Sequence, residues 1–364
     1  MDTLAMDELR DFSLSRLAEL SARFPELRVA VVGDFFLDKY LDVDPSLAET
    51  SVETGKIAHQ VVAVRHSPGA AGTIVSNLAA LDAGELYAIG FTGDDGEGYD
   101  LRSGLQKIGC STEYLYADRR LMTPTYLKPR DINQTGLAGE HSRYDTKNRK
   151  PTAAELEEKI IHALEMLVPR VDAVIAQDQV EEDGCGVLTS KVVETLSDLA
   201  ERYPENVFWA DSRYRIRRFR GQIVKPNQYE VLGLVRHTPE MPVEMSVLYA
   251  AVISLRNEVQ SPVCCTLGAG GMLVSDPHPT LVPGVKLSGP TDPTGAGDSA
   301  TAGAVLALAA CATLPEAALI GNLVASLTVE QLGTTGTARR EQLPDRLQLW
   351  LSQRHDTVRV RKEG

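Results

Sequence analysis

A glycine-rich segment towards the C-terminal end of the chain holds the residue types best suited to chemistry. It reads GPTDPTGAGDSAT over 289–301 and runs into the small-residue sequence Ala302–Leu314, which predicts a buried helix. Gly295 and Gly297 allow a tight turn, so free N–H groups at the helix start would converge beside the carboxylate of Asp298. N–H groups that stabilise negative charge, next to a proton acceptor, suit phosphoryl transfer to a hydroxyl group. The same residues also fit a plain glycine turn in which Asp298 caps the helix.

Acidic and amide residues recur where the predicted strands end. In an open α/β sheet the carboxyl ends of the strands form the rim at which ligands bind. Asp and Asn are also common in turns and helix caps, but this number of them along one rim favours a site for Mg²⁺ and sugar-like hydroxyl groups, because carboxylates bind both. The rim residues are Asp34, Gly93-Asp94, Asp178, Asp211, Asn227, Glu230 and Gly268.

The elements that position these residues alternate along most of the chain. Helices are predicted at 153–168, 187–202 and 243–257, with strands at 173–176, 207–210, 222–224 and 263–267. Ahead of them the sequence predicts a strand at 27–32, a helix at 72–81 and a strand at 86–92. Such alternation predicts an α/β fold built from βαβ units around a parallel sheet.

Two stretches, 35–66 and 115–145, do not fit the parallel-sheet pattern. They contain the strand-like sequences KIAHQVVAV at 56–64 and TYLKPRDIN at 125–133. At the N-terminal end, apolar residues spaced over 6–24 predict an amphipathic helix.

Composition and motifs exclude several classes of protein. The 364 residues include 37 Lys and Arg against 50 Asp and Glu, and the resulting net charge of −13 argues against a nucleic-acid partner. No apolar run is long enough to span a membrane, and the acidic N-terminus lacks the features of a secretion signal, so a cytoplasmic location is expected. The five cysteines form no CxxC pair, which argues against a disulfide framework or a zinc site. The motif of P-loop ATPases is absent.

The segment Asp292–Ser299, DPTGAGDS, resembles the C-terminal signature of the ribokinase, or PfkB, family of carbohydrate kinases. Other segments agree with the family in order and spacing: VVGDFFLDKY at 31–40, SPGAAGTIVSNLAAL at 67–81, GFTGDDGEG at 90–98, KPNQYE at 225–230 and TLGAGGM at 266–272. The resemblance covers about 27–340. It implies a ribokinase-like fold, with a mostly parallel central sheet flanked by helices and a small β-sheet lid formed by the two irregular stretches.

The resemblance also implies roles for matching residues, with ATP and Mg²⁺ as cofactors. Asp298 matches the catalytic base, and Gly295, Ala296 and Gly297 match the anion hole. Expected substrate-binding residues are Asp34, Gly69, Thr73, Asn77, Lys128 and Arg143, and expected nucleotide-binding residues are Asn227, Thr266, Gly268, Gly271 and Asn322. Asn227 and Glu230 are expected to hold Mg²⁺ largely through water.

One motif departs from the family pattern. Where the family has G-G-x-x-N, this chain has Gly69-Ala70-Ala71-Gly72-Thr73. The methyl group of Ala70 should crowd the floor of the sugar site, and Thr73 offers a hydroxyl group in place of an amide. Asn77, one helical turn further on, either replaces that amide or is a packed polar residue.

Within the family the chain looks most like the kinase half of bifunctional heptose enzymes, which phosphorylate heptose 7-phosphate at C1. This predicts an ATP-dependent kinase for a phosphorylated sugar, whose second phosphate needs cations, with Lys128, Arg130, Arg143 and Arg213 as candidates. Two alternatives remain: a kinase for another sugar or a nucleoside, and a catalytically weak sugar-binding or regulatory protein. The intact Asp298, Asn227 and Glu230 argue against the last.

The predicted organisation has three parts: an N-terminal helical extension over 1–26, a kinase domain over 27–345 with its lid segments, and a C-terminal tail over 346–364. Lid strands in this family often pair between subunits and so cover exposed strand edges. A homodimer is therefore expected.

Overall fold

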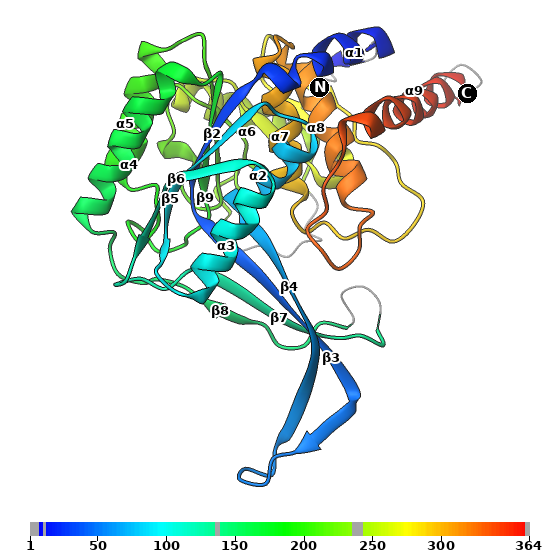
Figure 1. Ribbon diagram of the computed structural model, residues 1–364. Helices are drawn as coiled ribbons and strands as arrows, with labels where there is room; N and C mark the ends of the chain where they lie inside the picture. Colours follow the sequence, from blue (N-terminus) through cyan, green and yellow to red (C-terminus); the bar gives the residue numbers. More distant parts are fainter. Residues whose placement is uncertain (1–6, 10–11, 135–138, 235–242, 361–364) are drawn as a thin grey trace.

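The computed structural model describes residues 7–9, 12–134, 139–234 and 243–360 (Figure 1). At its centre is a six-stranded sheet in the order β11-β10-β9-β2-β5-β6, in which all neighbours are parallel. Its strands are β2 (Arg28–Gly33), β5 (Glu85–Gly93), β6 (Cys110–Asp118), β9 (Ala173–Asp178), β10 (Val207–Ser212) and β11 (Ile223–Val224). The predicted α/β fold with a parallel sheet is confirmed.

Helices cover both faces of this sheet, because its strands carry apolar side chains on both sides. Along β2, Val29 and Val31 pack into one hydrophobic cluster, whereas Ala30 and Val32 pack into another. The first cluster includes residues of α1 (Leu14–Ala22), α2 (Ala71–Ala80), α3 (Gly96–Lys107), α7 (Ala296–Ala309), α8 (Leu314–Thr328) and α9 (Leu343–Val360). The second includes residues of α4 (Ala154–Leu167), α5 (Ser190–Arg202) and α6 (Met245–Val259). Within the described residues, every helix is too short or too polar to cross a membrane.

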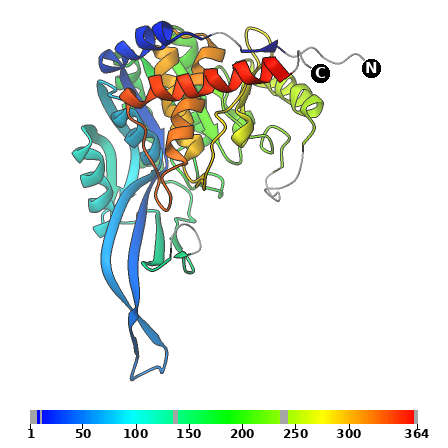
Figure 2. The ribbon, with the colours of Figure 1, turned by 90° about the vertical axis from the view of Figure 1, so that its right-hand side faces the viewer.

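A second sheet forms the predicted lid, in the order β4-β3-β7-β8. Its strands are β3 (Phe35–Thr50), β4 (Ile57–Ala70), β7 (Thr125–Asp131) and β8 (Tyr144–Thr146). The outer parts of β3 and β4 form a two-stranded arm that projects far from the body (Figure 2). Residues 115–118 of the second predicted lid segment instead belong to β6, and 135–138 lie outside the described residues.

A third, smaller sheet continues the rim of the central one. It has the order β1-β14-β13-β12, with strands β1 (Asp7–Glu8), β12 (Cys264–Thr266), β13 (Met272–Val274) and β14 (Thr280–Val282). Parallel bridges from Val224 to Val263 and from Asn227 to Thr266 join its edge to the chain around β11. Short 3₁₀ helices lie at Phe24–Glu26, Val168–Arg170, Ile216–Arg218, Gly268–Gly270 and Arg340–Gln342.

The helix predicted over 6–24 is wrong in extent. Residues 7–8 are the strand β1, parallel to β14, and the helix α1 begins only at Leu14. Ser13 caps it by accepting a hydrogen bond from the N–H of Arg16 at 3.0 Å, which explains its late start. The buried Leu17 and Leu20 pack the helix against its own chain. Residues 6, 10 and 11 lie outside the described residues.

The buried helix predicted over Ala302–Leu314 is in fact parts of two helices. Helix α7 ends at Ala309, and α8 begins at Leu314. Thr313 and Glu316 form a capping box that starts α8, and Cys311 turns the chain with a φ of 71°. The uniform run of small residues concealed this break, because alanine packs equally well in either helix or at their junction.

The boundary predicted at 345 falls inside α9. Its side chains Leu347 and Trp350 are fully buried, and the indole N–H of Trp350 donates to the carbonyl of Pro283 at 2.8 Å. The first part of the predicted tail is therefore a packed helix. Residues 361–364 lie outside the described residues.

Candidate active site

A cavity of about 1040 Å³ opens at the carboxyl ends of the central strands. It lies between the ends of β9 and β10, the loops around β11 to β13, and the first turn of α7. This is the rim that the strand-end residues predicted. Its polar lining includes Gln177, Asp211, Arg213, Lys225, Asn227, Glu230, Thr266, Asn322 and Asp298.

Asp298 lies in the first turn of α7, at the floor of this cavity. The N-cap of the helix is Gly295, whose φ of 77° is in the left-handed region that glycine tolerates. The alternative in which Asp298 is itself the cap is therefore wrong. N–H groups in the first turn of a helix have no carbonyl partner within it, so those of Gly297 and Asp298 can face an anion.

The charges around Asp298 set its acid–base behaviour. Burial raises the pKa of Asp298 to about 7, and the Asp211 carboxylate adds to the increase. Lys225, Arg213 and Asp38 also act on it, the first two by lowering its pKa and the third by raising it. A carboxylate with this pKa can accept a proton near neutral pH.

Lys225 occupies the centre of the acidic cluster. Its Nζ atom lies 2.7 Å from Asp211 Oδ2 and 3.3 Å from the position that a Cβ on Gly297 would take. Burial lowers its pKa, but Asp211, Glu230 and Asp298 outweigh this, so the net pKa is raised and the ammonium group stays charged. Lys225 lies within the KPNQYE motif but had no predicted role; its only signal was a cation inside a run otherwise matched to ligand binding.

Arg213 is an exposed cation at the same cavity. Among the described residues, its guanidinium makes no hydrogen bond or ion pair. Its charge reaches the site, because it lowers the pKa of both Asp298 and Glu230. Of the four cations predicted for a second phosphate, Arg213 is the one that lines this cavity.

Asn227 and Glu230 form a compact turn beside Lys225. Asn227 Oδ1 accepts from the N–H groups of Tyr229 and Glu230 at 2.8 and 2.9 Å, and Glu230 Oε2 accepts from the N–H of Asn227 at 2.8 Å. Burial, followed by the Asp211 charge, raises the pKa of Glu230 to about 7.

This donor set fits Mg²⁺ in one particular way. The oxygen atoms of Asn227, Glu230 and Asp298 are the hard ligands that Mg²⁺ prefers. Within the described part of the chain, however, no three acidic, histidine or cysteine side chains are close enough to enclose a metal ion. An ion bound here would take most of its ligands from water and phosphate oxygens, and the Mg²⁺ site stays a prediction.

The other end of the cavity is mainly apolar and contains the predicted nucleotide-binding residues. Thr266, Gly268, Gly271 and Asn322 line it together with apolar side chains, namely Met272, Val285, Leu287, Ala325 and Val329. A Cβ on Gly271 would lie 2.2 Å from the carbonyl oxygen of Val282, so only glycine fits there. Asn322 donates to that carbonyl at 3.0 Å and so holds the cavity wall. Such an apolar slot suits a planar base.

Asp34 lies outside this cavity. Its carboxylate accepts hydrogen bonds from the backbone N–H groups of Gln179, Val180 and Val187 at 2.8 to 3.0 Å. With its oxygen atoms occupied and only 4% of its surface exposed, Asp34 is a structural residue in this conformation. Its predicted role in sugar binding needs correction.

Asp38, four residues further on, is the acid that the sequence analysis missed. It is buried, forms an ion pair with Lys128 at 2.8 Å, and raises the pKa of Asp298 across the cavity. A Cβ on Gly69 would lie 2.9 Å from Asp38 Oδ2, so the predicted site residue Gly69 serves this close approach. In the sequence, Asp38 could have been found as the second aspartate of the motif GDFFLDKY.

Thr73 and Asn77 lie beneath the site and not in it. The methyl group of Thr73 lies 3.3 Å from where a Cβ on Gly295 would be, so it supports the glycine turn. The amide of Asn77 donates to the carbonyls of Thr73 and Gly336 at 3.1 and 3.3 Å. Asn77 is fully buried, which confirms the packed-residue alternative.

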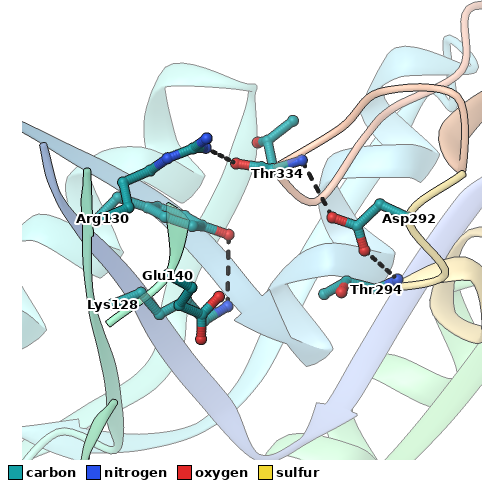
Figure 3. Close-up of a pocket in the computed structure, with 8 residues that line it drawn as sticks. Lys128, Arg130, Glu140, Asp292, Thr294 and Thr334 are labelled. Carbon is teal, nitrogen blue, oxygen red and sulfur yellow. Dashed lines mark hydrogen bonds between the residues drawn. The ribbon is translucent and has the colours of Figure 1, made fainter. Parts of the chain in front are cut away.

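The remaining predicted cations have partners elsewhere. Arg143 pairs with Asp145 at 2.7 Å and lies 4.5 Å above the ring of Tyr126. Arg130 donates to the carbonyl of Gly333 at 3.2 Å beside a small cavity of about 30 Å³, which also contacts Lys128, Glu140 and Asp292 (Figure 3). That volume corresponds to about two or three water molecules.

Comparison with known proteins places the chain in a family. A family model described as "pfkB family carbohydrate kinase" matches residues 28–340. Bifunctional protein HldE of Bradyrhizobium sp. (strain ORS 278) is 28% identical over 90% of this chain and 65% of its own length. Bifunctional protein HldE of Caulobacter vibrioides is 29% identical over 87% of this chain and 63% of its own length. The chain thus spans just under two thirds of the length of these curated relatives.

Solved structures share the fold at low identity. Ribokinase from Cryptococcus neoformans var. grubii serotype A, in complex with ADP, aligns with a TM-score of 0.63 and 19% identity, covering 88% of this chain and 99% of its own. Phosphofructokinase-2 from Escherichia coli, in complex with fructose-6-phosphate, aligns with a TM-score of 0.64 and 18% identity, covering 90% and 99% of the two chains.

Proposed function

This chain belongs to the pfkB family of carbohydrate kinases, and from that premise we propose that it transfers the γ-phosphate of ATP to a hydroxyl group of a sugar, with Asp298 as the general base. One observation carries this assignment. Asp298, with a pKa raised to about 7, faces the cavity at the N-terminal turn of α7. A proton acceptor and an anion-binding turn therefore meet at one point.

Each charged group has a separate task in this reaction. Asp298 accepts the proton of the attacking hydroxyl group as the new O–P bond forms and the bond to the departing ADP breaks. The first-turn N–H groups of α7 and the ammonium group of Lys225 stabilise the negative charge that develops on the transferred phosphoryl group. A Mg²⁺ ion held by Asn227 and Glu230 through water would neutralise charge on the phosphates of the nucleotide.

The sugar occupies the side of Asp298 nearest the lid. Asp38 and Gln177 offer oxygen atoms to sugar hydroxyl groups there. The Oε1 atom of Gln177 is buried and, within the described residues, has no hydrogen-bond partner. The lid strands that carry Asp38 and Lys128 would cover the sugar and exclude water, which otherwise competes as a phosphoryl acceptor.

We propose a phosphorylated sugar, such as heptose 7-phosphate, as the acceptor. Three observations support this class: the resemblance to bifunctional heptose enzymes, a fold neighbour that binds fructose-6-phosphate, and Arg213, an open cation at the cavity. A guanidinium group is well suited to a phosphate because it forms two parallel hydrogen bonds. ATP and sugar phosphates are cytoplasmic metabolites, so we place the reaction in the cytoplasm.

The proposed active form is a homodimer joined through the arm. The arm exposes apolar side chains that a single copy leaves uncovered, among them Val52, Ile57, Val62 and Val64, with exposed fractions of 96, 65, 50 and 50%. A second arm from an identical chain would cover these residues and the free strand edges.

A substrate panel tests the assignment. ATP consumption with Mg²⁺ would be measured against sedoheptulose 7-phosphate, other heptose phosphates, fructose and mannose phosphates, free hexoses and nucleosides. We expect turnover on a phosphorylated sugar that Asp298→Asn abolishes. Turnover on a free sugar or a nucleoside would instead support a kinase for that class of substrate. Folded protein that binds ATP but turns over none of these would support a binding or regulatory protein instead.

A further inference from the structure

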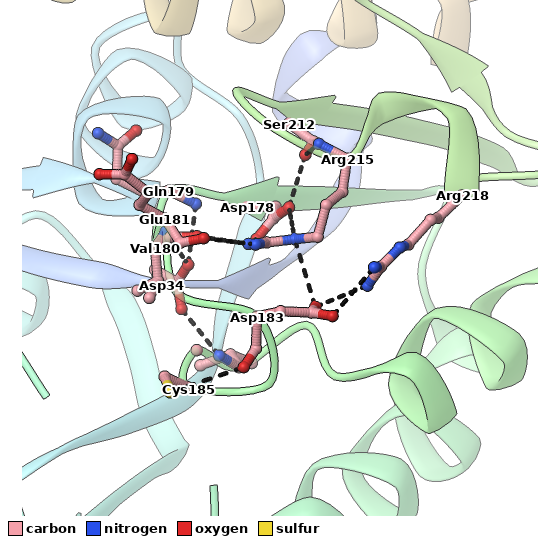
Figure 4. Close-up of polar contacts among 12 residues, drawn as sticks. Asp34, Asp178, Gln179, Val180, Glu181, Asp183, Cys185, Ser212, Arg215 and Arg218 are labelled. Atoms are coloured by element: carbon pink, nitrogen blue, oxygen red, sulfur yellow. Dashed lines mark hydrogen bonds and ion pairs between the residues drawn. The ribbon is translucent and has the colours of Figure 1, made fainter. Parts of the chain in front are cut away.

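The segment 179–187, here called the seat segment, has no regular secondary structure but is fixed by buried polar contacts (Figure 4). On one side the carboxylate of Asp34 accepts three of its N–H groups, those of Gln179, Val180 and Val187. A Cβ on Gly186 would lie 2.7 Å from Asp34 Oδ1, so the carboxylate is tightly enclosed by the segment.

Arg215 holds the seat segment from the other side. Its guanidinium group donates to both oxygen atoms of Asp178, at 2.6 and 3.1 Å, to the carbonyl of Glu181 at 2.9 Å, and to the carbonyl of Val180. The side chains of Arg215 and Asp178 are only 10% and 2% exposed. The fixed, planar fork of arginine can satisfy all these acceptors together, which a lysine ammonium group cannot.

This network is costly to bury, and its three charged side chains lie outside the cavity, although Gln179 of the seat segment lines it. Of its two buried carboxylates, Asp178 pairs with the guanidinium group of Arg215, whereas Asp34 accepts only backbone N–H groups. Burial, followed by the Asp178 charge, raises the pKa of Asp34 to about 6. Buried ion networks contribute little net stability compared with apolar packing. None of Asp34, Asp178 and Arg215 lines the 1040 Å³ cavity, so no direct contact with substrate explains them.

The lid rests on the seat segment. Phe36 of β3 packs in a buried cluster with Val180 and Cys185. The ring of Tyr126, on β7, lies 4.9 Å from the ring of Phe36, and its hydroxyl group lies 3.4 Å from Gln179 Nε2. Both lid strands that lead to the sugar side therefore meet the seat segment at their roots.

The regular alternation of side chains along the lid strands links the seat segment to the proposed sugar site. Side chains two residues apart on a strand share a face, so Asp38 follows Phe36 on β3 and Lys128 follows Tyr126 on β7. These two strands pair in parallel, with Asp38 opposite Tyr126 and Tyr40 opposite Lys128. The place of the Asp38–Lys128 pair thus depends on where Phe36 and Tyr126 rest.

We infer that Arg215, with Asp34 and Asp178, is a positioning group for the phosphoryl acceptor: it keeps the seat segment rigid, so that the lid roots hold Asp38 and Lys128 at a fixed distance from Asp298. The inference rests on the proposed sugar site. It predicts that loosening the seat segment impairs use of the sugar while nucleotide binding, which involves the other end of the cavity, is unaffected.

The test variant is Arg215→Lys, which keeps the charge but loses the fork. We expect the KM for the best acceptor of the substrate panel to rise about 10- to 100-fold, because small displacements of a positioned group are amplified in the rate. The KM for ATP should stay within about twofold. Less sugar phosphate should form per ATP consumed, since a displaced lid admits water. Hydrogen–deuterium exchange should increase in peptides covering 179–187, 36–40 and 125–128.

Arg28→Lys is the matched control, because Arg28 makes a two-pronged ion pair with Asp172, at 3.2 Å, at the amino ends of the central strands and away from the seat segment. It should change none of these quantities. Should Arg215→Lys fail to fold, the double variant Asp178→Asn/Arg215→Gln removes both buried charges. It should likewise raise the KM for the acceptor and leave the KM for ATP unchanged. Unchanged acceptor KM with faster exchange, or failure of both variants to fold, would show a purely structural network and refute the inference. Exchange needs no substrate, so an inactive wild type would count against the proposed function alone.

Discussion

Three carboxylates, Asp211, Glu230 and Asp298, share the space around Lys225. Asp211 carries the ion pair with Lys225 and raises the pKa of each of the other two. The cluster therefore keeps one firm salt bridge and leaves two carboxyl groups that titrate near pH 7. These properties fit the proposed reaction, in which Lys225 is a fixed cation that stabilises phosphate charge and Asp298 is a base that accepts a proton.

The pH dependence of kcat should follow Asp298. Because only the ionised carboxylate accepts a proton, kcat should fall about tenfold per pH unit below about 7. Lys225 lowers this pKa, so Lys225→Met should move the acidic limb to higher pH as well as reduce kcat, whereas Lys225→Arg should keep the limb near its original place. Initial rates between about pH 5 and 9 would show this. An acidic limb at the same pH in Lys225→Met would contradict the assignment.

Asp298→Asn should stabilise the folded protein at alkaline pH. Because its folded pKa is raised from 3.8 to about 7, this carboxyl group ionises first in the unfolded chain, so it costs stability that accumulates between about pH 4 and 7 and stays constant at higher pH. Removing the charge should increase the free energy of unfolding at pH 8 by on the order of 2 kcal/mol, with little change near pH 4. Urea unfolding at the two pH values measures it. Equal stability of both proteins at pH 8 would refute the raised pKa.

At the scale of elements, the junction between β4 and α2 decides how closely the lid approaches the site. Gly69 makes room for Asp38, and Ala70 follows with a φ of 51° and a ψ of −117°, a conformation that side chains rarely adopt. The family pattern has glycine at this second position. The departure from the family pattern therefore has a structural effect. The backbone of Ala70 is strained, next to the seat segment.

Substitutions at these two neighbours should have opposite effects. Gly69→Ala would push a methyl group against Asp38 and raise the KM of the sugar by about tenfold or more. Ala70→Gly would relieve the strained φ and raise the free energy of unfolding by about 1 kcal/mol. Kinetics on the best acceptor and urea unfolding would be measured on both. A loss of stability in Ala70→Gly would show that the strain is absent.

Prediction from the sequence succeeded where a residue type has only one physical use. Glycines 295 and 297 beside Asp298 predicted the turn at the start of α7, because a left-handed backbone at Gly295 and free N–H groups are needed there. The role of Asp298 as a base stays a prediction. Prediction from the sequence failed where the role of a residue depends on which distant residues it contacts in the fold. Nothing in GDFFLDKY shows that Asp34 turns to backbone N–H groups while Asp38 faces Lys128. Strand β6 was missed because only its pairing with β5 separates it from the lid segment that follows.

At the scale of the whole molecule, the most prominent feature of the described residues is the arm. It extends from the lid roots to exposed apolar residues far from the body (Figure 2). Its inner ends carry Asp38 and, through β7, Lys128. Any contact made by the outer arm therefore acts on the same strands that bear the proposed sugar site.

Charged residues on the arm should separate the dimer. Val62→Lys with Val64→Lys places positive charges where apolar contact is expected. The wild type should sediment at twice the 39.5 kDa chain mass and the variant at the single mass, with an increased KM for the sugar. Leu349→Lys, an exposed apolar position on α9, is the control and should remain dimeric. A wild type of single mass would rule out the proposed dimer.

The packing of the two chain ends has a consequence for how this enzyme can be joined to others. Strand β1 pairs with β14, and Trp350 of α9 donates to Pro283, so both elements support the wall of the cavity at its proposed nucleotide end. Strand β1 and helix α9 lie at the end of the molecule opposite the arm (Figure 2). A second catalytic unit appended behind α9 would thus leave the lid free to move. Shortening α9 itself should weaken affinity for ATP before it affects affinity for the sugar.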